Sequence, residues 1–156
     1  MNRDRSGLQV VLSAEGIYSP RPSPVPGDLM REWRIAALLV LLARCHRQTA
    51  SIAQVHAYGR AMLVPEAQPT VQARQREPFA TIPVFREDPA WTRAVDLAVG
   101  LGYATWTNNG GVALTDHGSG AARLISGSSA LAPERAFLES VRPTQAAVEG
   151  LMGRRG

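Results

Sequence analysis

The region from Asp88 to Ile125, DPAWTRAVDLAVGLGYATWTNNGGVALTDHGSGAARLI, constrains the fold of this chain more than any other. Asp88 is a typical helix N-cap and Pro89 suits a first helical turn. The apolar residues that follow recur at spacings typical of one buried helical face: Trp91, Ala94, Val95, Ala98 and Leu101. The pattern predicts an amphipathic helix that begins after Asp88 and ends at Gly100 and Gly102.

A two-stranded β-hairpin is predicted directly after this helix. Residues 103–107 and 112–114 alternate apolar and polar side chains, and the four residues between them, Asn108, Asn109, Gly110 and Gly111, tolerate positive φ angles. Thr115 or Asp116 then caps another helix, which carries Ala121, Ala122, Leu124 and Ile125. The order helix, hairpin, helix is typical of the second half of a winged helix. The sequence therefore predicts a mainly α-helical winged helix-turn-helix domain with a small β-hairpin wing and extra C-terminal helices.

Two further helices are predicted before this region. Asp28 can cap the first, which is largely apolar and continues to about His46. This helix is expected at the centre of the core, or partly buried by a second subunit. Thr49 or Ser51 can cap the second, which ends by Pro65 and presents one face made of Ile52, Val55, Gly59 and Met62.

The chain is predicted to have three parts. Residues 1–27 form an extended, proline-rich arm that is either a linker or a partner-binding segment. Residues 28–126 form the winged-helix domain, with a loop at 63–87. Residues 127–156 form a helical extension that closes the core or docks on another protein.

Three short segments within these parts carry predictions of their own. The run LQVVL at 8–12 is a candidate strand. The polar stretch from Gln68 to Glu77 is expected to be an irregular, solvent-exposed part of the loop. The run TIPVF at 81–85 is a candidate edge strand that can pair with the wing, because proline is tolerated where no ladder donor is needed.

Composition limits the choice of function class. A chain of 156 residues with 45% hydrophobic residues supports one modest core. The net charge is +4, but all 17 basic residues are arginine, a bias that fits genome composition and that serves protein interfaces as well as nucleic acid. The single cysteine, Cys45, excludes an intrachain disulfide and is expected to be a small buried hydrophobe. With no signal segment and an apolar run at 35–43 too short to cross a bilayer, a soluble cytoplasmic protein is expected.

No catalytic constellation is recognisable. The three histidines, His46, His56 and His117, are scattered, and His56 is better explained as a partly buried structural residue than as a base. Cys45 and His46 have no second ligand pair at a zinc-binding distance, and no phosphate-binding glycine loop occurs. We expect a protein that is not an enzyme and holds no cofactor and no metal.

The predicted recognition helix is poorly suited to DNA. Between Pro89 and Leu101 it offers only Arg93 as a base reader or phosphate clamp, accompanied by Asp96, and the wing tip has no charge. Arg74 and Arg76 in the loop can contact nucleic acid held by a larger complex, or simply face solvent. The arginines of the first helix, among them Arg31 and Arg34, can likewise contact nucleic acid held by a larger complex or simply face solvent. These observations favour a winged helix that contacts proteins.

Three segments resemble the middle components of bacterial ABC-three-component conflict systems. They are MREWRIAALLVLLARCHRQTASIAQVHAYGRAML, the region from Asp88 to Ile125, and LAPERAFLESVRPTQAAVEGLM, and together they span roughly residues 30 to 152. Within them the resemblance is carried by SIAQVH at the start of the second helix, RAVDLAVG before the wing, and ERAFL near the C-terminus. None of these motifs is catalytic.

The resemblance implies a non-enzymatic winged-helix adaptor subunit that bridges an ABC or SMC-like ATPase and an effector, often a nuclease, in a bacterial anti-phage defence complex. DNA would be contacted, if at all, through the complex. The residues predicted to anchor partners are large and apolar: Trp33, Leu39, Phe137, Leu151 and Met152, each of which has burial in the core as its alternative. The competing hypothesis is a winged-helix transcriptional regulator, a homodimer in which Arg93 reads a base.

Overall fold

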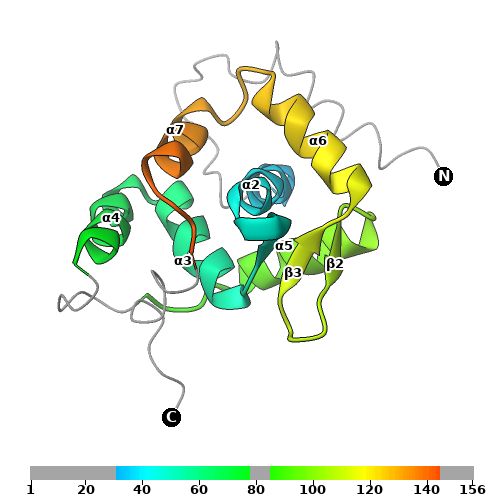
Figure 1. Ribbon diagram of the computed structural model, residues 1–156, viewed down its shortest axis with the longest axis horizontal. Coiled ribbons are helices and arrows are strands. Elements are labelled where there is room, and N and C mark those ends of the chain that lie inside the picture. Colours follow the sequence, from blue (N-terminus) through cyan, green and yellow to red (C-terminus); the bar gives the residue numbers. More distant parts are fainter. Residues whose placement is uncertain (1–30, 78–84, 145–156) are drawn as a thin grey trace.

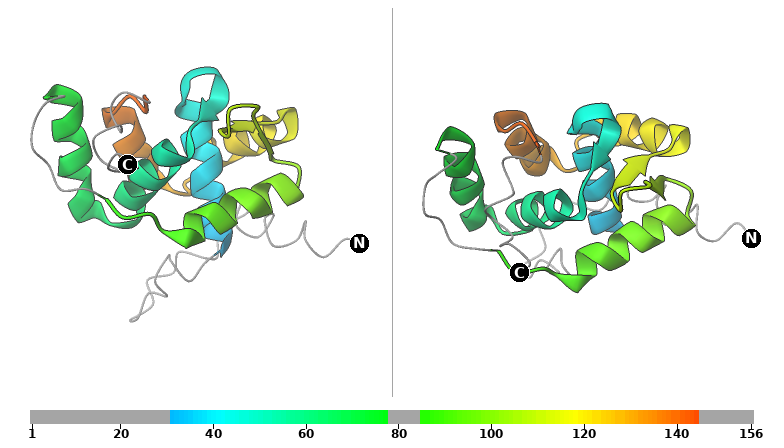
Figure 2. Two further views of the ribbon diagram at one scale, coloured as in Figure 1. Left: turned by 90° about the horizontal axis from the view of Figure 1, so that it is seen from below. Right: turned by 60° about the horizontal axis from the view of Figure 1, so that its bottom comes forward.

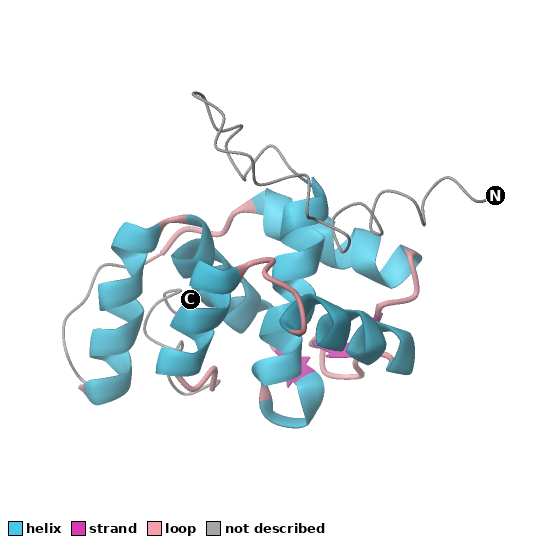
Figure 3. Ribbon diagram, turned by 90° about the horizontal axis from the view of Figure 1, so that it is seen from above, coloured by secondary structure: helices cyan, strands magenta, loops and turns pink. Residues whose placement is uncertain are grey.

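The computed structural model describes residues 31–77 and 85–144. These residues form helices and a small sheet (Figures 1 and 3): α2 Arg31–Arg44, η2 His46–Gln48, β1 Thr49–Ala50, α3 Ile52–Leu63, η3 Pro65–Ala67, α4 Gln68–Arg76, α5 Pro89–Gly100, β2 Ala104–Trp106, β3 Val112–Leu114, α6 Asp116–Ser126 and α7 Ala132–Ser140. The protein is thus mainly helical with one small antiparallel sheet, as the sequence predicts at that level. No helix of the described part is long and apolar enough to cross a membrane.

Helix α2 is the centre of the core. It lies in the middle of Figure 1, seen nearly end-on, and packs against α3, α5, α6 and α7. Every residue from Arg34 to Leu42 is buried. A helix that is apolar on nearly all sides requires neighbours on all sides. The central position predicted from the sequence is therefore confirmed without a second subunit.

The sheet has three strands in the order β1-β3-β2. Figure 2 shows its hairpin between α5 and α6. The predicted hairpin is confirmed, since β2 and β3 pair antiparallel with Trp106 opposite Val112. The third strand is β1, which comes from between the first two helices and places Ala50 opposite Val112 on the other side of β3. The sequence predicts Thr49 only as a possible helix cap, and the run TIPVF at 81–85 only as a candidate edge strand that can pair with the wing. Residues 81–84 lie outside the described residues, and Phe85 is in no strand.

The predicted caps are largely confirmed. Ser51 and Gln54 form a reciprocal capping box at the start of α3. Asp88 caps α5 by accepting a hydrogen bond from the Ala90 amide at 2.9 Å. Thr115 caps α6 by accepting from the Gly118 amide at 3.1 Å. The cap proposed at Asp28 lies outside the described residues.

Gly59 lies in the interior of α3 for a packing reason. A Cβ at this position would come within 2.5 to 2.8 Å of three atoms of the Trp91 indole, which is fully buried. The missing side chain lets α3 and α5 approach closely around Trp91. The helix propensity that glycine loses, about 1 kcal/mol relative to alanine, is offset by this contact.

The segment between α3 and α5 differs from the sequence prediction. Residues 68–76 were expected to be an irregular loop, but they form helix α4, whose buried residue is Val71. Glutamine and arginine have good helix propensity, and Pro69 occupies the first turn, where its missing N–H costs nothing. The loop prediction was wrong here, because one buried residue gives too little apolar periodicity to indicate a helix.

The described part of the C-terminal extension closes the core. Phe137, Leu138 and Val141 are buried, and α7 packs against α2 (Figure 1). The proline-rich arm, with the candidate strand at 8–12, and residues 145–156 of the helical extension lie outside the described residues.

Candidate interaction surface

Exposed apolar side chains mark the helix and hairpin that follow residue 88. The large apolar residues exposed in the described part are Leu97 on α5 at 41%, Trp106 on β2 at 42% and Leu124 on α6 at 65%. Trp106 lies on β2, which is an edge strand of the sheet that the described residues form. Single exposed apolar residues are common, but a half-exposed tryptophan on a sheet edge is a frequent feature of protein contact sites.

The outward face of α5 and the hairpin tip are electrically nearly neutral. The charged residues of α5 are Arg93 and Asp96, both exposed. The tip residues Asn108, Asn109 and Gly110 are exposed and uncharged, and Gly110 has a φ of 79°. No concentration of positive charge therefore faces outward from this helix and this hairpin.

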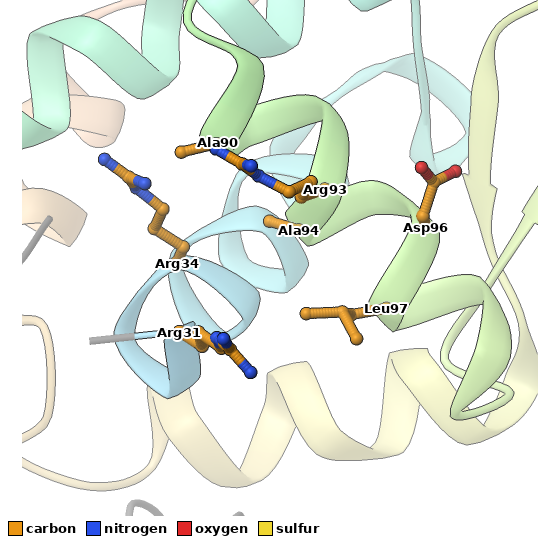
Figure 4. A pocket seen from close by; sticks show the side chains of 7 residues that line it. All are labelled: Arg31, Arg34, Ala90, Arg93, Ala94, Asp96 and Leu97. Atoms are coloured by element: carbon orange, nitrogen blue, oxygen red, sulfur yellow. The ribbon is translucent and has the colours of Figure 1, made fainter. Parts of the chain in front are cut away.

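A groove lies on one flank of α5, between that helix and the first turns of α2. We call it the arginine groove (Figure 4); its volume is about 630 Å³ and its lining residues are Arg31, Arg34, Ala90, Arg93, Ala94, Asp96 and Leu97. The side chains of Arg31, Arg34 and Arg93 surround an apolar floor formed by the two alanines, and Leu97 points into it. Figure 4 shows the Asp96 carboxylate on the other side of α5 from the Arg34 guanidinium.

Arg34 is the unusual member of this set because it is buried. Its side chain is only 8% exposed, and its ion pair with Asp88 is long, with 3.4 Å between Nη2 and Oδ2. The guanidinium carbon lies 5.7 Å from the centre of the Trp91 ring, a cation–π contact. Its Nε is buried and has no hydrogen-bond partner. Arg34 is therefore a positioned cation with unused donor capacity at the wall of a groove.

Asp88 connects the groove to α3. Its carboxylate caps α5 and pairs with Arg34, while its backbone N–H donates to Nδ1 of His56 at 3.1 Å. Because Nδ1 accepts this hydrogen bond, the proton of a neutral His56 is on Nε2, which lies 3.4 Å from Oγ1 of Thr92. His56 is 3% exposed and holds the first turn of α5 in place. This agrees with the structural role expected for it.

A second polar cluster holds residues 141–144, which we call the strap, against α3 and α4. Gln75 both accepts from the Arg142 amide, at 3.2 Å, and donates to the Arg142 carbonyl, at 2.6 Å. Tyr58 donates to the same carbonyl, and Gln54 donates to the Pro143 carbonyl at 3.1 Å. Burial raises the pKa of Tyr58, against the lowering effect of its hydrogen bond with Gln75. The strap contacts are uncharged and mutually satisfied.

Of the five apolar anchors predicted from the sequence, two are buried, one is half-buried and two lie outside the described residues. Leu39 is 0% exposed and Phe137 is 4% exposed, so both are core residues and neither is a surface anchor. Trp33 is half-buried and packs edge-on against Trp91, with the ring centres 6.1 Å apart. Leu151 and Met152 lie outside the described residues. Large apolar residues predicted from composition alone cannot be assigned to core or interface, because both environments favour the same side chains.

The predicted nucleic-acid contacts are distributed over two regions. Arg93 is exposed and lines the arginine groove. Arg74 and Arg76 lie on α4, at the left of Figure 1, and line neither this groove nor the hairpin. Arg31 and Arg34 were recognised only as part of a charged helix flank. Their spacing of three residues was the available signal that they share a face, but nothing in the sequence indicated that α5 would lie beside them.

The described residues show no cluster that could hold a metal ion. No group of three or more histidine, cysteine or carboxylate side chains there could hold a metal ion. Burial raises the pKa of the Cys45 thiol to about 12, which keeps it protonated and unreactive. Cys45 is 5% exposed in the core, as the sequence indicated. No protein-family model, curated protein or solved structure matches this chain.

Proposed function

We propose that this chain is a winged-helix module that binds other proteins. The topology supports the fold: three helices, a strand between the first two, a hairpin after the third, and the sheet order β1-β3-β2. In this arrangement α5 takes the position of the recognition helix and β2 and β3 form the wing. Helix α4 is then an insertion between the second and third helices.

The single observation that carries the protein-binding role is the character of α5 and the wing. A DNA reader of this size needs several cationic side chains on these elements to neutralise phosphates. Here α5 carries one exposed cation beside one exposed anion, while Leu97 and Trp106 expose apolar surface. Contact with a protein would bury the apolar side chains of this surface, which is favourable. Contact with a polyanion such as DNA would bring it against a surface that needs more cations than it has.

Within this class we propose an adaptor subunit without enzymatic activity, which bridges an ABC or SMC-like ATPase and an effector in a bacterial anti-phage defence complex. The support is the resemblance of its helical and wing segments to the middle components of such systems. Its role would be to transmit a conformational change from the ATPase to the effector.

The test is co-expression of the full chain with the proteins encoded beside it, followed by purification through a tag on this chain. We expect a stoichiometric complex that contains an ATPase, identified by mass spectrometry. Trp106→Ser should weaken that complex, whereas Leu124→Ser, at an exposed position outside α5 and the wing, should not. Purification of the chain alone, with no ATPase at any stoichiometry, would contradict the adaptor proposal.

The alternative is a winged-helix transcriptional regulator. It is favoured by the presence of one exposed arginine, Arg93, on the helix that would enter the major groove. Under this alternative the chain purifies as a homodimer that retards a specific DNA fragment, and Arg93→Ala abolishes sequence discrimination. The adaptor proposal instead predicts that Arg93→Ala leaves any binding of DNA by the chain unchanged.

A further inference from the structure

Within residues 31–77 and 85–144, the lining of the arginine groove carries more positive than negative charge. Three of its lining residues are arginines and one is a carboxylate, Asp96, which Figure 4 shows on the other side of α5 from the Arg34 guanidinium. The Asp88 carboxylate, which pairs with Arg34, already caps α5. The Arg34 guanidinium is buried and shares only one long ion pair. Burial of an arginine whose donors are incompletely used is unfavourable unless an anionic ligand completes the arrangement.

The floor of the groove points to the kind of anion. Ala90 and Ala94 provide a small apolar surface, and Leu97, 41% exposed, borders it. A nucleic-acid backbone would use the arginines but leave this surface without a partner. A peptide segment that carries both carboxylates and an apolar side chain would use both, since planar guanidinium groups bind carboxylates in a bidentate manner. A groove of about 630 Å³ is within the usual size range of ligand sites.

We propose that the arginine groove is the docking site for an acidic segment of a partner protein, whose carboxylates bind Arg31, Arg34 and Arg93 and whose apolar side chain packs on Leu97. This inference rests on the proposed function in one respect, namely that the chain works by protein contact. It adds the place and the chemistry of that contact. Arg34 is the fixed part of the site, because Trp91 and Asp88 hold it, and the two exposed arginines close around the ligand.

The probe for this site is a short fluorescein-labelled peptide of alternating glutamate and leucine, titrated with the full chain and followed by fluorescence polarisation. Three ligands serve as controls: the same peptide with glutamine for glutamate, the same peptide with serine for leucine, and a single-stranded DNA oligonucleotide of equal length. We expect the glutamate–leucine peptide to bind most tightly, and its affinity to fall as salt is raised.

The variants compare arginines inside and outside the groove. Arg31→Gln combined with Arg93→Gln should reduce the affinity for the peptide by about tenfold or more. Arg76→Gln combined with Arg142→Gln removes the same charge from exposed positions outside the groove and should change it less than about twofold. Leu97→Gln should weaken binding and Leu124→Gln should not. The Arg34 side chain is left intact because its loss would disturb the cap of α5.

Several outcomes would overturn the proposal. Equal losses in the two double variants would show that only net charge matters. Equal binding of the glutamine peptide would exclude carboxylate recognition. An oligonucleotide that binds more tightly than the peptide, and loses its affinity in the Arg31 and Arg93 variant, would make the groove a nucleic-acid site instead.

The same double variant separates failure of this inference from failure of the proposed function. If the ATPase co-purifies equally with the wild-type chain and with the Arg31 and Arg93 variant, and the peptide does not bind, the adaptor proposal stands and the groove is not its docking site. If the peptide binds in the groove and no ATPase co-purifies, the docking site stands and the adaptor proposal fails.

Discussion

The strap and the arginine groove show two different uses of polar side chains in one small protein. At the strap, Gln54, Tyr58 and Gln75 satisfy the backbone of residues 142 and 143 with neutral hydrogen bonds. At the groove, Arg34 is buried with one long ion pair and an unpaired Nε, and Arg31 and Arg93 face the open space. The strap's polar groups named here have partners within the described residues, whereas Arg34 keeps an unpaired Nε at the wall of the groove.

This difference separates structural polar groups from available ones. A satisfied buried network stabilises the fold, and its loss is measured as a loss of folding free energy. A cation with unused donors contributes little to folding and can contribute to binding. Substitutions in the strap should therefore change stability, whereas substitutions at the groove should change affinity.

The largest effect is expected beneath the groove, where Trp91 supports Arg34. Gly59→Ala should destabilise the fold by about 1 to 3 kcal/mol, because the added methyl group overlaps a fully buried indole. Urea unfolding measures the change. The control is Gly120→Ala in α6, where nothing lies within 4 Å and where alanine should stabilise by about 0.5 to 1 kcal/mol. Equal effects of the two substitutions would mean that α3 and α5 are not packed closely around Trp91.

The next largest effect is expected at the strap. Gln75→Ala removes two hydrogen bonds to the Arg142 backbone and one to the Tyr58 hydroxyl, and should cost about 1 to 2 kcal/mol. Amide hydrogen exchange at Arg142 should become faster. Gln72→Ala is the matched control, since its bond to Ser140 is exposed, and should cost less than about 0.5 kcal/mol. If Gln75→Ala leaves the free energy of unfolding unchanged, the hydrogen bonds of Gln75 do not hold the strap in place.

Local sequence signals predicted the parts of the fold that local chemistry determines. The Asp88 cap with Pro89, the glycines before the hairpin, and the alternation on both sides of the asparagine and glycine turn were sufficient to locate α5, β2 and β3. Each of these signals lies within a few residues of the element that it determines.

Features that depend on distant segments could not be predicted in this way. The pairing of Thr49 and Ala50 with β3 involves only two residues, too few for a strand pattern. The groove forms because α2 and α5 are brought side by side, and only then does an arginine at position 34 become buried. A glycine at position 59 lowers the helix propensity of α3, and only its contact with Trp91, distant in sequence, explains why it is there.

Substitution of Asp88 is expected to lower the stability of the fold slightly and to raise the affinity for the glutamate–leucine peptide. Asp88→Asn keeps a good N-cap for α5 but removes the negative charge beside Arg34, and should cost less than about 1 kcal/mol. The same change leaves the groove more positive, so the glutamate–leucine peptide should bind about two- to fivefold more tightly. Asp88→Ala, which also removes the cap, should cost about 1 kcal/mol more. Weaker peptide binding by Asp88→Asn would show that the ion pair positions Arg34 rather than competes with the ligand.

The smallest effect is expected at Glu134, a half-buried acid on α7. Burial raises the pKa of Glu134 above its usual value of 4.5, although a hydrogen bond from Trp33 lowers it in part, and its Oε2 has no partner. An acid whose pKa is raised in the folded state favours folding at pH values below its unfolded pKa, and that stability is lost as the pH rises through the folded pKa.

Glu134→Gln should therefore match the wild-type protein at acidic pH and exceed its thermal stability at neutral pH, because glutamine still accepts from Trp33 and carries no charge to desolvate. Glu139→Gln, at an exposed position of the same helix, should show no such divergence with pH. A wild-type protein that gains stability relative to Glu134→Gln as the pH rises would show that Oε2 is paired in solution. Of the two residues compared, Glu134 and Arg34, only Arg34 would then keep an unsatisfied polar atom.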